Sequence, residues 1–481
     1  MVERLRVRKV KENIFYLLKH NIHFNSSFLI FFFPIFKLQK CSMQTADKKV
    51  INAWAMYDWA NSAYNLVITT TIFPAYYDAI TTTRTNGVAN HKIIFSGSEF
   101  ESASLYNYAI ALAYLIIAVI SPILSSIADY KGNKKKFMQF FCYLGSLACC
   151  SLYWFTKNTL SLGIICCILA AIGYCGSLVF YNSYLPEIAS DEDKDRVSAK
   201  GFAYGYIGSV LLQLVCFAFV LKPEFFGIKD SSFAPRLSFL LVGIWWMGFA
   251  QIAFARLPEG IAAFQNKGNN ILTNGFKELN KVWTQIKHMP VLKRYLLSFF
   301  FYSMGVQTVM LAATLFASQV IGLPTPKLII SLLIIQIVAI AGAYIMAKLS
   351  QRFGNFQVLI LVVLIWIAIC ICAYFITTEF EFYIIAVSVG LVMGGIQSLS
   401  RSTYGKIMPE THNTASFFSF YDVTEKIAIV IGMFSFGFVQ QLTGNMRNSV
   451  IALIIFFIAA LISLFMTLQK EKRAQVLNIA K

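Results

Sequence analysis

Long runs of apolar residues recur along this chain, separated by short polar segments. There are twelve such runs, six before and six after a longer basic segment. Each has roughly 20 residues or more, the length that an α-helix needs to cross about 30 Å of bilayer hydrocarbon. The pattern predicts an all-α membrane protein with twelve transmembrane helices in two six-helix halves. The predicted spans cover about residues 52–80, 104–128, 137–156, 160–185, 197–221, 235–255, 293–320, 327–347, 356–376, 381–408, 414–440 and 447–468.

The same pattern predicts the domain organisation. An N-terminal half covers residues 51–255, a C-terminal half covers 293–470, and a cytoplasmic tail covers 471–481. The segment 256–292 between the halves is too short to bury a core of its own. Five of its apolar residues share one helical face, which predicts an amphipathic helix on the cytoplasmic membrane surface. These residues are Leu272, Phe276, Leu279, Trp283 and Ile286.

Residues 1–50 form a separate N-terminal segment. Its apolar run at residues 28–36 contains Pro34 and is too short to span a membrane. The run is not followed by the small-residue cleavage site that is typical of a signal peptide. We favour the hypothesis that translation begins at Met43, and an intact-mass measurement of the protein tests it.

The composition agrees with a membrane protein, and the charge distribution indicates its orientation. The chain is 57% hydrophobic and 13% charged, whereas about 25% of residues in soluble domains are charged. If the N-terminus is cytoplasmic, 32 of the 41 Lys and Arg residues lie on the cytoplasmic side and 8 on the outer side. This asymmetry is the positive-inside pattern, so the net charge of +18 reflects topology rather than nucleic-acid binding. Both termini are therefore expected in the cytoplasm.

Two pairs of short motifs repeat between the halves. Gly132 and Asn133 follow the second span, and Gly354 and Asn355 follow the eighth, 222 residues later. A Pro-Glu pair ends the fourth span at 186–187 and the tenth at 409–410, 223 residues apart. The nearly constant offset indicates a duplication. Such internal symmetry is typical of secondary transporters, whose halves move about a central site.

Several longer motifs carry a resemblance to a known family. Residues 129–135 (DYKGNKK) are similar to the signature loop of the major facilitator superfamily, with Ser125 and Tyr130 in place of its usual Gly and Arg. Within that superfamily, the autophagy-related vacuolar effluxer-like family is matched by residues 53–64 (AWAMYDWANSAY), 181–189 (YNSYLPEIA), 196–205 (RVSAKGFAYG) and 394–402 (GGIQSLSRS). The resemblance covers roughly residues 50–470. It implies a twelve-helix transporter, with spans 1, 4, 7 and 10 around the cavity. Because the eukaryotic founder of the family is described as a vacuolar amino-acid exporter, the resemblance also suggests amino-acid export.

Polar residues of the first span fall on one helical stripe. Asp58, Asn61, Ser62, Asn65 and Thr69 are spaced at i, i+3, i+4, i+7 and i+11. Such a stripe would be costly against lipid, so it is expected to face the bundle interior or a water-filled cavity. Asn61 and Ser62 either contact a solute or form hydrogen bonds between helices. For Asp58 we favour a functional role over anchoring a gate.

Further polar residues are candidates for a central cavity. Tyr181 on the fourth span and Gln307 on the seventh are either cavity residues or packing residues. On the tenth span, Gln397 and Arg401 share a face. The guanidinium of Arg401 either extends to the membrane interface or provides a fixed positive charge for an anionic group of a solute.

Three ionisable residues lie together inside the eleventh span. Asp422, Glu425 and Lys426 occupy one helical face, and Asp422 and Lys426 have the i, i+4 spacing of an ion pair. Glu425 is expected to pair with Arg401 across helices. The group is either a purely structural network or includes a carboxylate that couples transport to protons.

The resemblance also implies gating loops at the cytoplasmic side. In the superfamily, the loop after the second span stabilises one conformation. By this analogy, Asp129, Gly132, Lys134 and Lys135 would form a latch. Glu187 and Glu410 would have the corresponding role at the ends of spans 4 and 10.

These features favour a secondary active transporter over other classes. The chain is expected to move a small solute by alternating access, with a proton as the coupling ion, and to be a monomer in a bacterial inner membrane. The family resemblance suggests amino acids as the solute and export as the direction. The sequence contains no P-loop, metal-ligand cluster or cofactor motif, so no cofactor and no enzymatic activity are expected. The first alternative is a non-transporting membrane sensor or scaffold with a transporter fold. The second is a lipid-modifying intramembrane enzyme, for which a nucleophile–base pair is missing.

Overall fold

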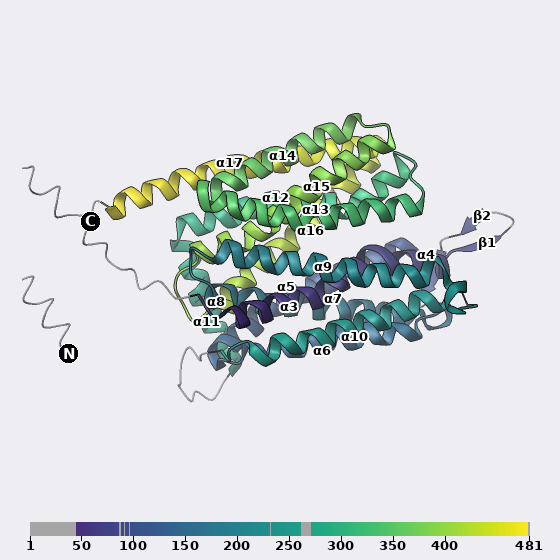
Figure 1. Ribbon diagram of the computed structural model, residues 1–481, viewed down its shortest axis with the longest axis horizontal. Coiled ribbons are helices and arrows are strands. Elements are labelled where there is room, and N and C mark those ends of the chain that lie inside the picture. The colour runs from purple at the N-terminus through teal and green to yellow at the C-terminus, as the bar shows by residue number, and fades with distance from the viewer. Residues whose placement is uncertain are drawn as a thin grey trace, which may run out of the picture. The chain divides into compact units, whose positions relative to one another are not determined.

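The computed structural model describes residues 45–85, 88–90, 92–95, 97–230, 232–260 and 271–479. The predictions about residues 28–36 and Met43 lie outside this part of the chain. The described residues form a bundle of long helices (Figure 1). The first half consists of α3 (Lys48–Ala63), η1 (Tyr64–Ile72), α4 (Phe73–Thr81), α5 (Ser102–Lys131), α6 (Lys134–Ser151), η2 (Leu152–Trp154), η3 (Lys157–Thr159), α7 (Leu160–Ser183), α8 (Leu185–Ile188), α9 (Lys194–Leu221), η4 (Pro223–Phe226) and α10 (Phe233–Arg256).

The second half follows the helix of the connecting segment. That helix is α11 (Ile271–His288), and its residues Val282 and Ile286 are buried whereas Phe276 and Trp283 are largely exposed. The second half consists of α12 (Pro290–Gln319), α13 (Thr325–Phe353), α14 (Asn355–Phe375), α15 (Glu379–Ile407), α16 (Thr414–Thr443) and α17 (Met446–Ile479).

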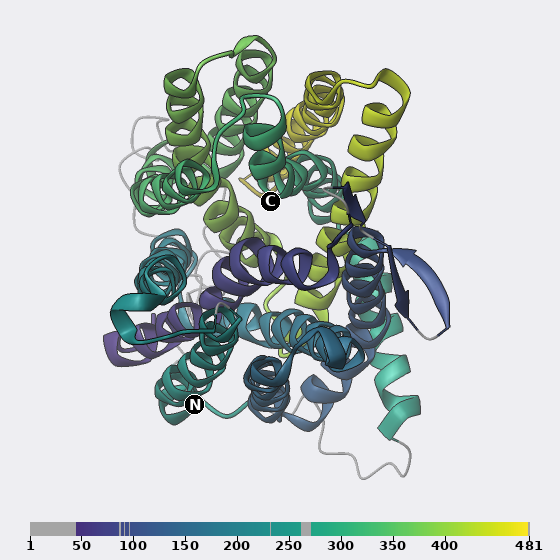
Figure 2. The same cartoon turned by 90° about the vertical axis from the view of Figure 1, so that its right-hand side faces the viewer.

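The helices confirm the predicted twelve-span architecture. Ten helices in the described ranges are long and apolar enough to cross a membrane. The remaining two spans are the continuous segment α3–η1–α4 and helix α16, which contain most of the ionisable residues predicted for the cavity. Each half has its own buried core, around Trp54 and Trp246 in the first and around Trp366 and Phe457 in the second. Figure 2 shows the two groups of helices, purple to teal and green to yellow, in a view along the bundle.

Four short strands, which were not predicted from the sequence, lie between α4 and α5. They are β1 (Thr83–Thr85), β2 (Val88–Asn90), β3 (Lys92–Phe95) and β4 (Ser98–Glu101). β1 pairs with β2 and β3 pairs with β4, both antiparallel. We name the end of the bundle near these strands the hairpin end. The opposite end, with α8 and α11, is the latch end (Figure 1).

The first span is not a regular α-helix along its whole length, and this changes the expected position of Thr69. Residues Tyr64–Ile72 form a π-helix, in which each turn is wider than in an α-helix. The hydroxyls of Thr70 and Thr71 follow this geometry, since they donate to the carbonyls of Asn65 and Leu66, five residues earlier, at 2.8 Å each. The predicted stripe therefore holds its α-helical spacing only as far as Ala63, and Thr69 does not line the central cavity.

Glycine allows α13 and α15 to pack at very short distance. A Cβ atom at Gly394 would lie 2.0 Å from the carbonyl oxygen of Ala339, and one at Gly342 would lie 2.1 Å from that of Leu391. Both obstacles are backbone atoms, which cannot move aside without shifting a whole helix. This interface therefore requires residues without a side chain.

Gly394→Ala is expected to destabilise the protein by about 2 kcal/mol or more, because overpacking at a backbone contact cannot relax through a rotamer change. Gly437→Ala is the matched control, since nothing lies within 4 Å of a Cβ at Gly437 on α16. Apparent melting temperatures in detergent compare the two variants. Equal melting temperatures would contradict the close packing.

Candidate functional site

A cavity of about 160 Å³ lies between the two halves. Helices α3, η1, α5, α7 and α9 contribute side chains from the first half, and α12, α15 and α16 from the second. Of the predicted cavity residues, eight line it: Asp58, Ser62, Asn65, Gln307, Gln397, Arg401, Glu425 and Lys426. The other three predicted residues, Asn61, Tyr181 and Asp422, are buried beside it.

A buried ion pair joins the halves at one side of this cavity. Arg401 Nη1 lies 3.2 Å from Asp58 Oδ2, and their side chains are 2% and 6% exposed. The hydroxyl of Tyr181 donates to the same carboxylate oxygen at 2.7 Å. Because Asp58 belongs to the first half and Arg401 to the second, this pair connects the halves directly.

Arg401 has further acceptors on the first half. Its guanidinium donates to Asn182 Oδ1 at 3.1 Å, to Ser198 Oγ at 3.0 Å and to the Ser198 carbonyl at 2.8 Å. The rings of Trp54 and Phe202 lie 4.7 and 4.2 Å from its central carbon, a cation–π geometry. Arg401 therefore does not extend to the membrane interface. The predicted pair between Arg401 and Glu425 is also wrong, because the guanidinium is bonded to Asp58, Asn182 and Ser198 of the first half.

The ionisable residues of α16 form a second cluster. Lys426 Nζ lies 3.4 Å from Asp422 Oδ1 and 3.2 Å from Glu425 Oε2, which confirms the predicted pairing of Asp422 with Lys426. Gln307 on α12 donates to Glu425 Oε1 at 3.0 Å. Lys426 also lies 5.7 Å from the ring centre of Tyr114 on α5, so the cluster contacts the first half. With both carboxylates ionised it carries one net negative charge.

The remaining predicted residues differ in their surroundings. Asn61 is fully buried, accepts a hydrogen bond from Ser62 at 3.4 Å, and its amide nitrogen has no hydrogen-bond partner among the described residues. Gln397 accepts a hydrogen bond at 2.6 Å from Tyr206 of the first half. Asn61 is therefore an interior residue of the first half, whereas Gln397 lies where the two halves meet.

The predicted latch loop contacts the second half. The Asp129 carboxylate accepts hydrogen bonds from the Ala415 amide at 3.2 Å and from the Ser416 amide and hydroxyl, both at 2.7 Å. These amides are in the first turn of α16, where backbone donors lack partners within the helix and an acidic group is favourable. Gly132 ends α5 with φ of +66°, a conformation that suits glycine.

The lysines after Gly132 also form ion pairs at the latch end. Lys134 pairs with Glu187, which accepts a further hydrogen bond from Thr414 of the second half at 2.6 Å. Lys135 pairs with Glu259 at 3.1 Å. The loop after the second span therefore connects the ends of spans 4 and 6 with the start of span 11.

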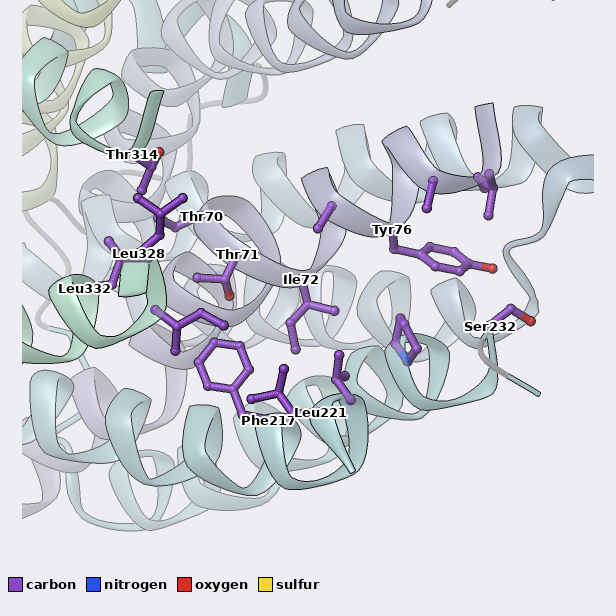
Figure 3. A pocket seen from close by; sticks show the side chains of 16 residues that line it. Thr70, Thr71, Ile72, Tyr76, Phe217, Leu221, Ser232, Thr314, Leu328 and Leu332 are labelled. Atoms are coloured by element: carbon purple, nitrogen blue, oxygen red, sulfur yellow. The ribbon is translucent and has the colours of Figure 1, made fainter. Parts of the chain in front are cut away.

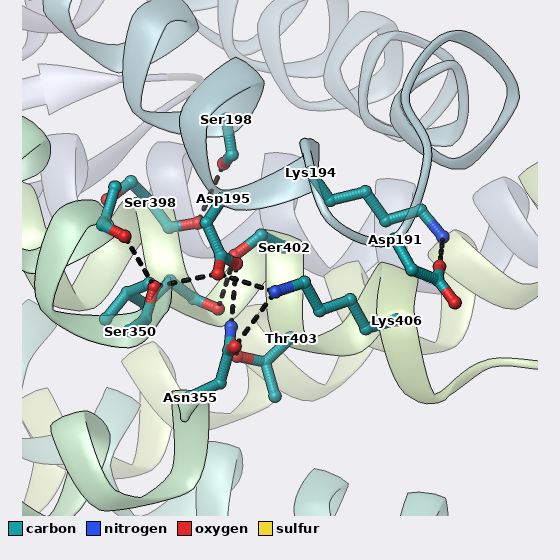
Figure 4. A network of polar contacts seen from close by, with 12 residues as sticks. Asp191, Lys194, Asp195, Ser198, Ser350, Asn355, Ser398, Ser402, Thr403 and Lys406 are labelled. Carbon is teal, nitrogen blue, oxygen red and sulfur yellow. Dashed lines mark hydrogen bonds and ion pairs between the residues drawn. The ribbon is translucent and has the colours of Figure 1, made fainter. Parts of the chain in front are cut away.

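A related network joins the start of α9 to α13, α14 and α15 (Figure 4). Asp195 at the start of α9 is fully buried. It accepts hydrogen bonds from Ser350 and Asn355, both at 2.7 Å, and pairs with Lys406 at 2.5 Å. Here the loop after span 8 contacts the start of span 5, as the loop after span 2 contacts the start of span 11. The acidic residue, however, lies in the first turn of α9, whereas Asp129 lies in the last turn of α5.

Asp195 is not among the residues predicted from the sequence, whereas Glu410 was expected to act in this half. Glu410 is exposed, and none of the ion pairs in the described part of the chain includes it. The equivalence between Glu187 and Glu410 therefore does not extend to their contacts. Close to the network, hydrogen bonds from Thr45 and Arg196 hold the pKa of Asp193 below its ordinary value.

Asp195→Asn is expected to weaken contact between the halves at the latch end by about 1–3 kcal/mol, because Lys406 loses its charged partner. Asp230→Asn is the matched control, since Asp230 is 57% exposed and pairs with Arg236 of the same half, and exposed pairs contribute less than about 1 kcal/mol. Distances between spin labels on the two halves measure the effect. Identical distance distributions for both variants would contradict a role of Asp195 in closure.

Comparisons with known proteins agree with this architecture. Residues 46–476 match the model of the family described as "Vacuole effluxer Atg22 like". The chain is 34% identical over 414 residues to an uncharacterised MFS-type transporter, YxiO of Bacillus subtilis, covering 86% of this chain and 93% of that protein. It is 25% identical over 467 residues to autophagy-related protein 22 of Eremothecium gossypii, covering 87% and 90%.

A solved structure shows the same fold. The proton:xylose symporter XylE, a major facilitator superfamily protein, superposes with a TM-score of 0.66 at 13% identity, covering 88% of this chain and 95% of XylE. The twelve spans, the cavity between two halves and the family match over 46–476 lead to one assignment. The chain belongs to the Atg22-like vacuole effluxer family and is a multi-pass membrane transporter of the major facilitator type.

Proposed function

We propose that this transporter exports amino acids by alternating access, with a proton as the coupling ion. The observation that carries the proposal is the central cavity, which both halves line with groups of opposite charge. A zwitterionic solute needs a cation for its carboxylate and an anion for its ammonium group. Lys426 of the second half and Asp58 of the first half supply one of each on the wall of the cavity.

The contacts between the halves support alternating access. Hydrogen bonds to Asp129 and Asp195 join the halves at the latch end, and the hydrogen bond from Arg401 to Asp58 joins them at the cavity. Opening the latch end would require these bonds to break, and the halves would then separate around the cavity. The structure described here would accordingly be the state that is closed at the latch end.

The cluster on α16 supports proton coupling. Its two carboxylates share one lysine, so binding one proton would leave the cluster without net charge. A carboxylate that is protonated in one conformation and ionised in the other can couple solute movement to a proton gradient. XylE is itself a proton symporter.

Location and orientation complete the proposal. The excess of Lys and Arg in alternate loops supports cytoplasmic termini, which would place the latch end on the cytoplasmic side. The similarity to YxiO of Bacillus subtilis supports a bacterial inner membrane. We propose a monomer as the functional unit, because the cavity lies within one chain.

A binding and flux experiment on the purified protein tests the function. Amino acids, sugars and organic anions are compared for their ability to raise the apparent melting temperature, since a ligand stabilises the state that it binds. Labelled solutes that do so are then tested for exchange across proteoliposomes. We expect amino acids to bind and exchange, and Lys426→Gln to abolish both.

Lys327→Gln is the control, because Lys327 is 45% exposed and pairs with Glu379 away from the cavity. Binding of sugars or organic anions alone would discard amino-acid export and retain the transporter. Binding of amino acids without flux would instead favour the sensor alternative.

A further inference from the structure

A larger cavity, of about 490 Å³, lies between the halves at the hairpin end (Figure 3). Its walls come from η1, α4, the end of α9 and the start of α10 in the first half, and from α12 and the start of α13 in the second. It shares no lining residue with the central cavity. It is therefore a separate space, to which the proposed function assigns no role.

Four of the five side-chain hydroxyls in its wall, all except that of Thr314, donate hydrogen bonds to the protein. The hydroxyls of Thr70 and Thr71 donate to backbone carbonyls of η1 at 2.8 Å, and Thr71 also donates to Gln213 at 2.9 Å. The hydroxyl of Tyr76 donates to the Phe155 carbonyl at 2.8 Å. These side chains therefore present mainly apolar atoms to the cavity, namely the methyl groups of the threonines and the ring of Tyr76. A polar solute would regain few of its lost hydrogen bonds with water there, whereas hydrocarbon would lose none.

The cavity is continuous with the lipid-facing surface of the bundle. Leu221, which lines it, is 54% exposed. Ile330, next to the lining residue Ile329, is 49% exposed on α13. Both belong to apolar helices that are long enough to span a membrane, so the hydrocarbon of the bilayer lies beside the opening.

We propose that this cavity binds an acyl chain of a membrane phospholipid, inserted between the halves from the leaflet at the hairpin end. An apolar space of this size would otherwise leave its walls without dispersion contacts on one side. The inserted chain contacts α4 of the first half and α13 of the second. It therefore stabilises the conformation in which the halves are joined at the latch end and separated at the hairpin end.

Photocrosslinking in vesicles tests the proposal. The full-length protein is reconstituted in phosphatidylethanolamine and phosphatidylglycerol with a trace of phospholipid that carries a diazirine in its acyl chain. After irradiation, labelled peptides are mapped. We expect labelling to concentrate on α4, the end of α9 and the start of α13, above the level on other lipid-facing helices.

Variants that fill the cavity provide the comparison. Ala75 is an exposed wall residue on α4, so Ala75→Phe places a ring in the space. Each methylene of the chain contributes about a fourfold factor to binding, so exclusion of two lowers the labelling about fifteenfold. Ala111→Phe is the matched control, at an exposed position of α5 outside the cavity. If Ala75→Phe fails to fold, Ala79→Phe, one turn further along α4, replaces it.

Three outcomes would overturn the proposal. The first is labelling that is no stronger on the cavity helices than around Ala111. The second is labelling that persists in the folded Ala75→Phe or Ala79→Phe variant. The third is loss of labelling on addition of an amino acid or a free fatty acid, which would identify another occupant. None of these readouts depends on transport, so failure of the proposed function would leave the test intact.

Discussion

Arg401→Ala is expected to abolish transport and to lower the stability of the latch-closed state by about 3–5 kcal/mol. The variant leaves the Asp58 carboxylate buried without its charged partner, and breaking one side of a buried pair costs about this much. The variant also removes the two hydrogen bonds that Arg401 donates to the hydroxyl and the carbonyl of Ser198 on the first half. Transport in proteoliposomes and the apparent melting temperature measure the two effects.

A charge-neutral double variant separates stability from function. Asp58→Asn with Arg401→Gln removes both buried charges together, so much of the lost stability is expected to return. Transport is expected to stay absent, because the neutral pair no longer provides a charged contact that forms in one conformation and breaks in the other. Arg401→Lys retains the charge but loses the fork of donors that reaches several acceptors at once. Normal transport by the double variant would show that the pair has only a structural role.

The spans and the identity of most cavity residues could be predicted from the sequence, because both follow from local spacing. Apolar runs of sufficient length have few alternatives to a transmembrane helix. Polar side chains inside such a helix must face the interior, which places Asp58, Gln397 and Lys426 in one region before any tertiary contact is known.

The pairing of charged residues could not be predicted in the same way. Arg401 lies on α15, within reach of acids on both halves, and only the packing of α9 against α15 decides between them. Gly201 makes this approach possible, since a Cβ there would lie 2.7 Å from Asp58 Oδ2 and 2.8 Å from Arg401 Nη2. The glycine is part of the family motif at 196–205, but the motif does not reveal which residues it contacts.

The π-helix and the network around Asp195 could not be predicted for a different physical reason. A π-helix has no simple periodicity in the sequence, and the run of threonines at 69–71 would also be compatible with an α-helix. Asp195 has the position of an ordinary acidic residue in the first turn of a helix. Its complete burial comes from Ser350 and Asn355, which lie 155 and 160 residues away.

Glu425→Gln is expected to abolish gradient-driven flux while exchange of solute across the membrane continues. Glutamine has the shape of a protonated glutamate and can still accept the hydrogen bond from Gln307, so the geometry of the cluster is retained. Lys426 keeps Asp422 as its partner. The substitution removes the site for the coupling proton, and gradient-driven flux is expected to fall by about a hundredfold or more.

Glu99→Gln is the matched control, because Glu99 is 61% exposed and pairs with Lys92 within the β3–β4 hairpin, away from the cavity and from the latch end. Its removal is expected to leave both kinds of transport unchanged. Flux driven by an imposed pH gradient and exchange at equal pH are measured on the same vesicles, so a folding defect would reduce both. Undiminished gradient-driven flux in Glu425→Gln would exclude Glu425 as the coupling residue and leave Asp422, the other acid that pairs with Lys426, as the next candidate.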